Sequence, residues 1–188
     1  MSVAEFSLFG VPRLELDGRA VEPGRKKSSA LLYYMAAERG PLERSAAAGL
    51  LWPEFPPDRA RGSLRAALLD IERAAGARLF AAGGSCLAFD DGLELRVDAA
   101  EFIRLSDLGF ASRDGDVIPL LKSAADLYRG PFLSGFYLKD AYEFEDWQLR
   151  MSDRFRHRAA RVLERLSEQY RLAGMLDEAA DTAERLIA

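Results

Sequence analysis

The stretch PPDRARGSLRAALLDIERAAG, residues 56–76, decides how the surrounding sequence is interpreted. At 100° per residue four apolar residues fall in one sector, namely Leu64, Ala67, Leu68 and Ile71, and Leu69 points the opposite way. This periodicity predicts a helix that packs one face against a core. The opposite side of the first turns is small and basic, with Arg59, Gly62 and Ala66. Because helix N-terminal amides and guanidinium groups both favour anions, this helix is a candidate to enter a nucleic-acid groove.

The segments before this helix predict short strands and two further helices. Residues 5–22 alternate apolar and polar side chains and break at Gly10 and at an Asp-Gly pair, which predicts two or three antiparallel strands. Helical patterns follow over 24–40, closed by a Gly-Pro pair, and over 42–52, stopped by a proline. A helix, a turn and a second helix form the arrangement that presents a DNA-contacting helix.

Residues 77–98 have the pattern of a β-hairpin. Three apolar runs are separated by Gly-Gly and Asp-Gly turn signals, at 79–80, 87–89 and 93–97. After Asp98 only helical periodicity remains. We therefore expect an α+β winged helix-turn-helix domain over 1–98 and an all-α domain over 99–188.

The helical half predicts a long apolar seam. Its members recur every three or four residues as Trp147, Met151, Phe155, Ala159, Val162, Leu166 and Tyr170. Such a seam needs a partner helix, and residues 117–128 can supply one. Residues 163–188 have the offsets of a tetratricopeptide repeat. A repeat cannot bury its apolar face alone, so we expect this helical domain to be incomplete at Ala188.

The charge of the chain is unevenly distributed. The whole sequence has a net charge of -4, which argues against a protein that coats nucleic acid everywhere. Residues 25–78 contain ten basic and six acidic residues, a balance of +4, so the remainder carries -8. This polarity is typical of a local anion-binding face on an acidic body.

Several classes of protein are disfavoured. The apolar runs are too short to cross a bilayer, and the N-terminus lacks the basic and apolar regions of a secretory signal, so we expect a cytoplasmic protein without membrane contact. Cys86 is the single cysteine, which excludes an internal disulfide, and we expect it to be buried. His157 has no catalytic partner pattern, and no glycine-rich phosphate loop occurs. We therefore expect no catalytic residue, metal or cofactor, and no enzyme.

Six segments, taken in order, resemble the SARP-type bacterial transcriptional activators. They are FSLFGVPRLELDGRAV (6–21), RKKSSALLYYMAAERG (25–40), LLWPEFPP (50–57), ARGSLRAALLDIERA (60–74), LYRGPFLSGF (127–136) and FEDW (144–147). The resemblance implies an OmpR-like winged-helix DNA-binding domain joined to a bacterial transcriptional activator domain of tetratricopeptide-like helices. It also implies a sequence-specific activator that binds double-stranded DNA and recruits RNA polymerase, often as two protomers on direct repeats.

The candidate DNA-contact residues come from three helices. On the 56–76 helix they are Arg59, Arg61, Ser63, Arg65 and Arg73. Lys26 and Lys27 begin the 24–40 helix, where positive charge opposes the helix dipole, and this indicates an external anion. Arg44, in the 42–52 helix, is a further candidate for phosphate contact. For Arg73 an ion pair with Asp70 or Glu72 is the competing interpretation.

Other residues favour a second hypothesis. Leu69 stands where the family usually has a small polar residue, and Glu72 stands where it has an arginine. Carboxylates at Asp70 and Glu72 repel a phosphate backbone, and the expected wing tip, residues 81–85, has no charged side chain. The alternative is therefore a degenerate winged-helix and tetratricopeptide-like interaction module without DNA binding.

A second basic row lies in the helical half, at Arg150, Arg154, Arg158, Arg161 and Arg165. Acidic residues are interleaved with it, as Asp153, Glu164 and Glu168. Alternating charges of this kind predict a solvated helix surface rather than a binding site.

Overall fold

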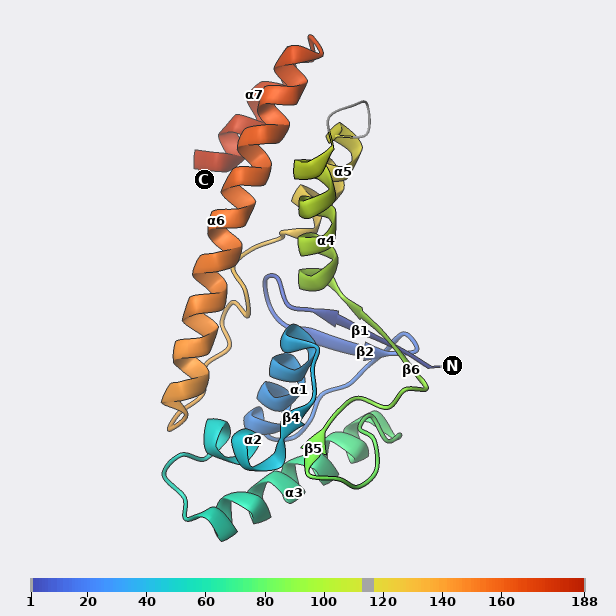
Figure 1. The fold of residues 1–188 in the computed structure, drawn as a ribbon, viewed down its shortest axis with the longest axis vertical. Coiled ribbons are helices and arrows are strands. Elements are labelled where there is room, and N and C mark those ends of the chain that lie inside the picture. The colour runs from blue at the N-terminus through green and yellow to red at the C-terminus, as the bar shows by residue number, and fades with distance from the viewer. Residues whose placement is uncertain (1, 113–116, 188) are drawn as a thin grey trace.

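The computed structural model describes residues 2–112 and 117–187, and its α+β winged helix-turn-helix part is followed by helices, as predicted (Figure 1). Strands β1 (Ser2–Ser7), β2 (Arg13–Leu16) and β3 (Arg19–Ala20) are paired antiparallel in sequence order. Asp17 and Gly18 have φ values of 50° and 77°, so the Asp-Gly pair makes the tight turn between β2 and β3 that its sequence predicts.

The predicted hairpin over 77–98 is only partly right. Phe80 and Phe89 form an antiparallel bridge, but β5 (Cys86–Leu87) pairs with β4 (Leu42–Glu43). β6 (Leu93–Val97) leaves the hairpin and runs parallel to β1, which completes a sheet of order β3-β2-β1-β6. Local alternation predicts a strand but not its partner, and the edge of β1 lies about 90 residues away in the chain.

Three helices complete the first half, namely α1 (Lys26–Glu38), α2 (Arg44–Leu51) and α3 (Pro57–Ala75). α3 begins with a proline in its first turn and ends at Gly76, whose φ is 65°. Its predicted apolar sector faces the core: Leu64, Ala67 and Ile71 are buried, and Leu68 is half-buried.

The second half contains α4 (Asp98–Ala111), α5 (Val117–Leu127), α6 (Tyr142–Leu172) and α7 (Leu176–Ile187). α4 packs closely on α5, because Gly109 has no side chain where Leu121 approaches: a Cβ there would lie 2.5 Å from the leucine Cδ2. The predicted seam of α6 is buried apart from Met151, which is half-buried. α5 and α7 are its partner helices.

One continuous core joins the two halves. The ring of Phe9, in the loop after β1, lies 5.3 Å from Phe102 of α4 and 5.0 Å from Phe155 of α6, between ring centroids. The segment between α5 and α6, residues 128–141 (the connecting segment), also lies against this loop: Leu133 N–H donates to the Leu8 carbonyl at 2.8 Å. The division into domains 1–98 and 99–188 therefore stays a prediction.

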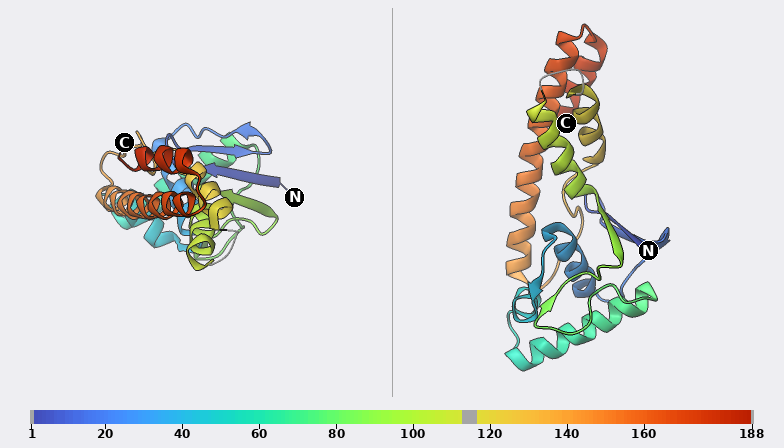
Figure 2. Two further views of the ribbon diagram at one scale, coloured as in Figure 1. Left: turned by 90° about the horizontal axis from the view of Figure 1, so that it is seen from above. Right: turned by 45° about the vertical axis from the view of Figure 1, so that its right-hand side comes forward.

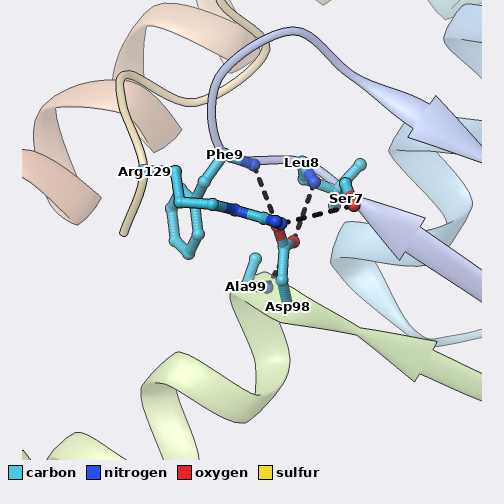
Figure 3. Close-up of polar contacts among 6 residues, drawn as sticks. All are labelled: Ser7, Leu8, Phe9, Asp98, Ala99 and Arg129. Atoms are coloured by element: carbon cyan, nitrogen blue, oxygen red, sulfur yellow. Dashed lines mark hydrogen bonds and ion pairs between the residues drawn. The ribbon is translucent and has the colours of Figure 1, made fainter. Parts of the chain in front are cut away.

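Asp98, at the first position of α4, fixes this junction (Figure 3). Its Oδ1 accepts hydrogen bonds from the backbone N–H groups of Leu8 (2.8 Å) and Ala99 (2.7 Å), and its Oδ2 accepts one from Phe9 (3.2 Å). Arg129 Nη2 lies 3.4 Å from the same Oδ2. Burial raises the pKa of Asp98, and the hydrogen bonds and the nearby guanidinium oppose that rise.

Candidate nucleic-acid interface

α3 lies at the end of the molecule opposite α7 (Figure 1 and the right-hand view of Figure 2). It packs against α1 and α2, and the helical half does not cover its outer side in these views. The helix that the sequence predicts as the groove-entering element is therefore open to a large partner.

The outer side of α3 presents a row of residues four positions apart. They are Arg61, Arg65, Leu69 and Arg73, and all four are exposed. Among the residues that the structure describes, Arg65 and Arg73 have no ion-pair partner. Two guanidinium groups of this face are thus available to an external anion.

The other predicted residues of α3 have internal contacts. Arg61 pairs with Asp58, which lies in the first turn and does not cap the helix. The Arg59 guanidinium stacks on the ring of Phe55, 4.0 Å from its centroid, and remains exposed. Ser63 is half-buried on the side toward α1.

Both carboxylates that argue against DNA binding have partners inside the protein. Asp70 Oδ2 accepts a hydrogen bond from the backbone N–H of Arg25 at 3.1 Å, just ahead of α1. Glu72 Oε1 lies 3.6 Å from Arg78 Nε. The competing interpretation of Arg73, an ion pair with one of them, is therefore wrong. These partners also offset the charge that the carboxylates present to a phosphate backbone.

Arg44 and Arg78 supply charge near the wing, whose tip has none of its own. Arg44 Nε donates to the Gly84 carbonyl at 3.2 Å, and its backbone N–H donates to the Ser85 carbonyl at 2.9 Å. Arg44 and Arg78 line one hollow together with Leu68 and Glu72 of α3 and residues 80–83 of the wing. The sequence interpretation missed Arg78; its place in the basic span of residues 25–78 was the available signal.

Lys26 and Lys27 lie on the other side of α3, at the start of α1. Lys26 is exposed, whereas Lys27 is half-buried and its Nζ donates to the Asp140 carbonyl at 3.4 Å. This ammonium also lies 5.6 Å from the ring centroid of Trp52. Burial lowers the pKa of Lys27. The structure brings both lysines and Ser63 into one groove, separate from the hollow at Arg44.

The basic row of α6 is not simply solvated surface, and the prediction is wrong for the two residues that are half-buried, Arg158 and Arg165. Arg158 is half-buried, and its Nη1 lies 2.6 Å from Asp107 Oδ1 of α4. Arg161 lies over the Phe110 ring, 4.9 Å from its centroid, and Arg165 is half-buried. Arg150, Arg154 and Arg161 are exposed without an ion-pair partner among the described residues. A local charge pattern cannot show that α4 lies beside this face.

Few features of the described residues suggest another kind of site. They contain no group of three or more His, Cys, Asp or Glu side chains placed to hold a metal ion. No described helix is both long and apolar enough to cross a membrane. His157 is exposed, as expected. Cys86 is exposed too, so the prediction that it is buried is wrong: β4 and β5 form only a two-stranded ladder, with no layer over this side chain.

Comparison with known proteins gives a likeness of fold. No family model matches the chain, and no curated protein matches it. Among solved structures, EmbR of Mycobacterium tuberculosis in complex with a low-affinity phosphopeptide is similar, with a TM-score of 0.64 and 20% sequence identity. The match covers 99% of this chain and 59% of that one. The chain thus spans less than two thirds of the protein whose fold it shares.

Proposed function

We propose that this protein is a DNA-binding transcription regulator of the SARP type, and not an enzyme. The observation that carries the proposal is the exposed face of α3, where Arg65 and Arg73 have no carboxylate partner among the described residues. Its winged-helix framework, its likeness in fold to EmbR and the six SARP-like segments support the same conclusion.

In this proposal α3 docks in the major groove of double-stranded DNA. A major groove admits one α-helix, and arginine recognises guanine through two hydrogen bonds to O6 and N7. Arg61, Arg65 and Arg73 are presented along the row that faces the groove, while Arg59 and Ser63 lie beside it. Lys26, Lys27 and Arg44 flank α3 on its two sides and hold backbone phosphates, which fix the position of the helix.

The helical half has the second role in the proposal. It engages RNA polymerase, so that DNA binding by α3 activates transcription, and two protomers bind direct repeats as a homodimer. Exposed apolar side chains on α6 and α7, among them Leu149 and Leu176, are available for protein contacts of this kind. We place the division between the two domains at residues 98 and 99.

Fluorescence anisotropy with labelled duplexes tests the DNA claim. Because the target site is unknown, the duplex is first selected from a random library on the full chain. The logarithm of the affinity should fall linearly with the logarithm of salt concentration, by about 0.9 for each phosphate contacted. Arg61→Ala combined with Arg65→Ala should weaken binding, and Arg154→Ala on α6 is the matched control. A flat salt dependence, or no loss in the double variant, contradicts the claim.

Leu69 favours the second candidate function, a protein-interaction module without DNA binding. Its side chain is 60% exposed in the middle of the arginine row, and the wing tip beside α3 is uncharged. An exposed apolar residue flanked by arginines suits a protein interface, where arginine is enriched and the buried centre is apolar. Under this hypothesis the full chain selects no duplex from the library, and the arginine variants of α3 lower its weak, non-specific DNA affinity no more than loss of the same charge on α6 does.

A further inference from the structure

A basic groove lies where the connecting segment meets the start of α1. It has a volume of about 410 Å³ and contains four cationic side chains, those of Arg25, Lys26, Lys27 and Lys139. Ser63 of α3 and Tyr137 of the connecting segment also line it. No aspartate or glutamate is among its described lining residues.

The cations of this groove are poorly compensated within the protein. Arg25, Lys26 and Lys139 have no ion-pair partner among the described residues. Lys27 donates to the Asp140 carbonyl and lies over the Trp52 ring, and the Asp140 carboxylate is near enough to favour its charged form. Four like charges around one hollow repel each other, and an anion placed among them relieves that repulsion.

The backbone at this point adds to the positive potential. α1 begins here with no acidic residue in its first turn and no side-chain cap at Arg25. The amino end of a helix carries a partial positive charge and unpaired N–H groups. The carboxylate of Asp70 already accepts the N–H of Arg25, just ahead of this turn. The groove is therefore suited to an oxyanion such as a phosphate.

The connecting segment is held firmly in this place. Leu138 is buried, and Gln148 Nε2 donates to the Phe136 carbonyl at 2.9 Å. The Phe136 ring meets the Tyr33 ring of α1 edge to face, with centroids 5.3 Å apart. The neighbouring Tyr137 is 71% exposed, so its hydroxyl can donate to a ligand. Lys139 and Tyr137 are thus presented next to α3 by a pinned segment of the helical half.

We propose that this groove binds a backbone phosphate of duplex DNA and that Lys139 and Tyr137 of the helical half are DNA-contact residues, together with Arg25. The inference rests on the proposed docking of α3, because Ser63 places the groove directly beside that helix. It extends the interface beyond the winged-helix part: the helical half contributes to DNA affinity through its own side chains.

The test compares Lys139→Ala and Tyr137→Phe with Lys122→Ala, an exposed lysine of α5 away from α3. Loss of one phosphate contact should weaken binding roughly tenfold at 0.1 M salt and reduce the salt slope by about 0.9. The loss should be equal for a selected duplex and a scrambled one, because phosphates carry no sequence information. Tyr137→Phe should give a smaller loss of affinity with no change in the salt slope, because its hydroxyl carries no charge, and Lys122→Ala should have no effect. Thermal melting verifies that every variant is folded.

The outcomes separate this inference from the proposed function. If Arg65→Ala weakens binding but Lys139→Ala does not, the groove proposal is overturned and the regulator proposal stands. If the DNA affinity of the wild type does not depend on salt and neither variant changes it, both proposals fail. A further arm measures melting with 10 mM inorganic phosphate (on the order of intracellular anion levels). Phosphate that stabilises the wild type but not Lys139→Ala, without any effect of Lys139→Ala on duplex binding, also overturns the groove as a DNA site.

Discussion

Two helices of this protein carry rows of arginines, and the structure uses the rows differently. On α3, Arg65 and Arg73 are exposed and have no acidic partner among the described residues. On α6, Arg158 reaches Asp107 of α4 and Arg161 covers the ring of Phe110. These two α6 arginines contact the neighbouring helix α4, whereas Arg65 and Arg73 face solvent on α3, which lies at the far end of the molecule (Figure 1).

Both rows consist of arginines, so residue type does not distinguish a binding face from a face that stabilises the fold. The contacts that each arginine makes inside the protein do. An arginine packed against an aromatic ring or paired with a carboxylate contributes to folding through packing and charge-assisted hydrogen bonds. An arginine with no partner contributes little to stability, so its charge is available for an anion. Substitutions in the α3 row should therefore lower DNA affinity and leave stability unchanged. Substitutions of the packed α6 arginines should lower stability and leave DNA affinity unchanged.

The largest effect is expected on DNA affinity from Arg65→Ala combined with Arg73→Ala. Each base-contacting arginine contributes about 1–3 kcal/mol, so the pair should weaken binding to a selected duplex roughly 30-fold or more. The melting temperature should not change. Anisotropy and thermal melting measure the two quantities, and Arg150→Ala combined with Arg154→Ala is the matched control on α6. Equal losses in both doubles would show that the affinity comes from overall charge instead of from α3.

Arg158→Ala should have the converse effect. It removes the 2.6 Å contact to Asp107 from a side chain that is only 22% exposed, so the free energy of unfolding should fall by about 1–3 kcal/mol. Duplex affinity should be unchanged. Urea unfolding measures the loss, with Arg156→Ala as control, since the exposed Arg156–Asp153 pair contributes less than about 0.5 kcal/mol. If Arg158→Ala has the same free energy of unfolding as the wild type, the α6 arginines do not stabilise the fold and the two rows do not differ in this respect.

Local patterns predicted most of the framework and the location of the candidate site. The prediction of a helix over 56–76 agrees with α3 at Pro57–Ala75, because apolar periodicity, a proline start and a glycine end are all local signals. The seam of α6 was visible for the same reason. The parallel pairing of β6 with β1 was not, because it depends on a partner far away in the chain.

The partners of charged groups were the least predictable feature. Asp70 appeared to oppose DNA binding, yet its oxygen accepts the N–H of Arg25, 45 positions earlier. Lys139 lies in a segment without charge clustering, and only the fold places it beside Lys27 in one groove. Such pairings follow from tertiary packing, which periodicity and local composition do not encode.

Leu69 gives a smaller effect that sharpens the comparison. It interrupts the arginine row, so Leu69→Arg adds a fourth cation and should tighten binding to any duplex by about 1 kcal/mol. Stability should change by less than about 0.5 kcal/mol, because the side chain is 60% exposed. Leu149→Arg on α6 is the matched control, since Leu149 is 65% exposed. An unchanged affinity in Leu69→Arg would favour the protein-interaction module.

The smallest effect is expected at Arg129. Its side chain is exposed like the arginines of α3, but it has a carboxylate partner as Arg158 of α6 does. Its side chain is 54% exposed, and Nη2 lies 3.4 Å from the buried carboxylate of Asp98 (Figure 3). Burial raises the pKa of Asp98 above its ordinary 3.8, so the folded protein holds this proton more tightly than the unfolded chain does. The stability that comes from the protonated group is fully present below pH 3.8 and is lost as pH rises through the folded pKa.

The guanidinium of Arg129 offsets part of that loss, and only when Asp98 is ionised. Arg129→Ala should therefore cost almost nothing at pH 3.5 and less than about 1 kcal/mol at pH 7, as exposed ion pairs do. Urea unfolding at both pH values measures the difference. In an Asp98→Asn background no carboxylate is left to ionise, so the cost of Arg129→Ala should become independent of pH. A cost that is the same at both pH values in the wild-type background would mean that Arg129 acts by packing, like Arg161 over Phe110, and not through charge.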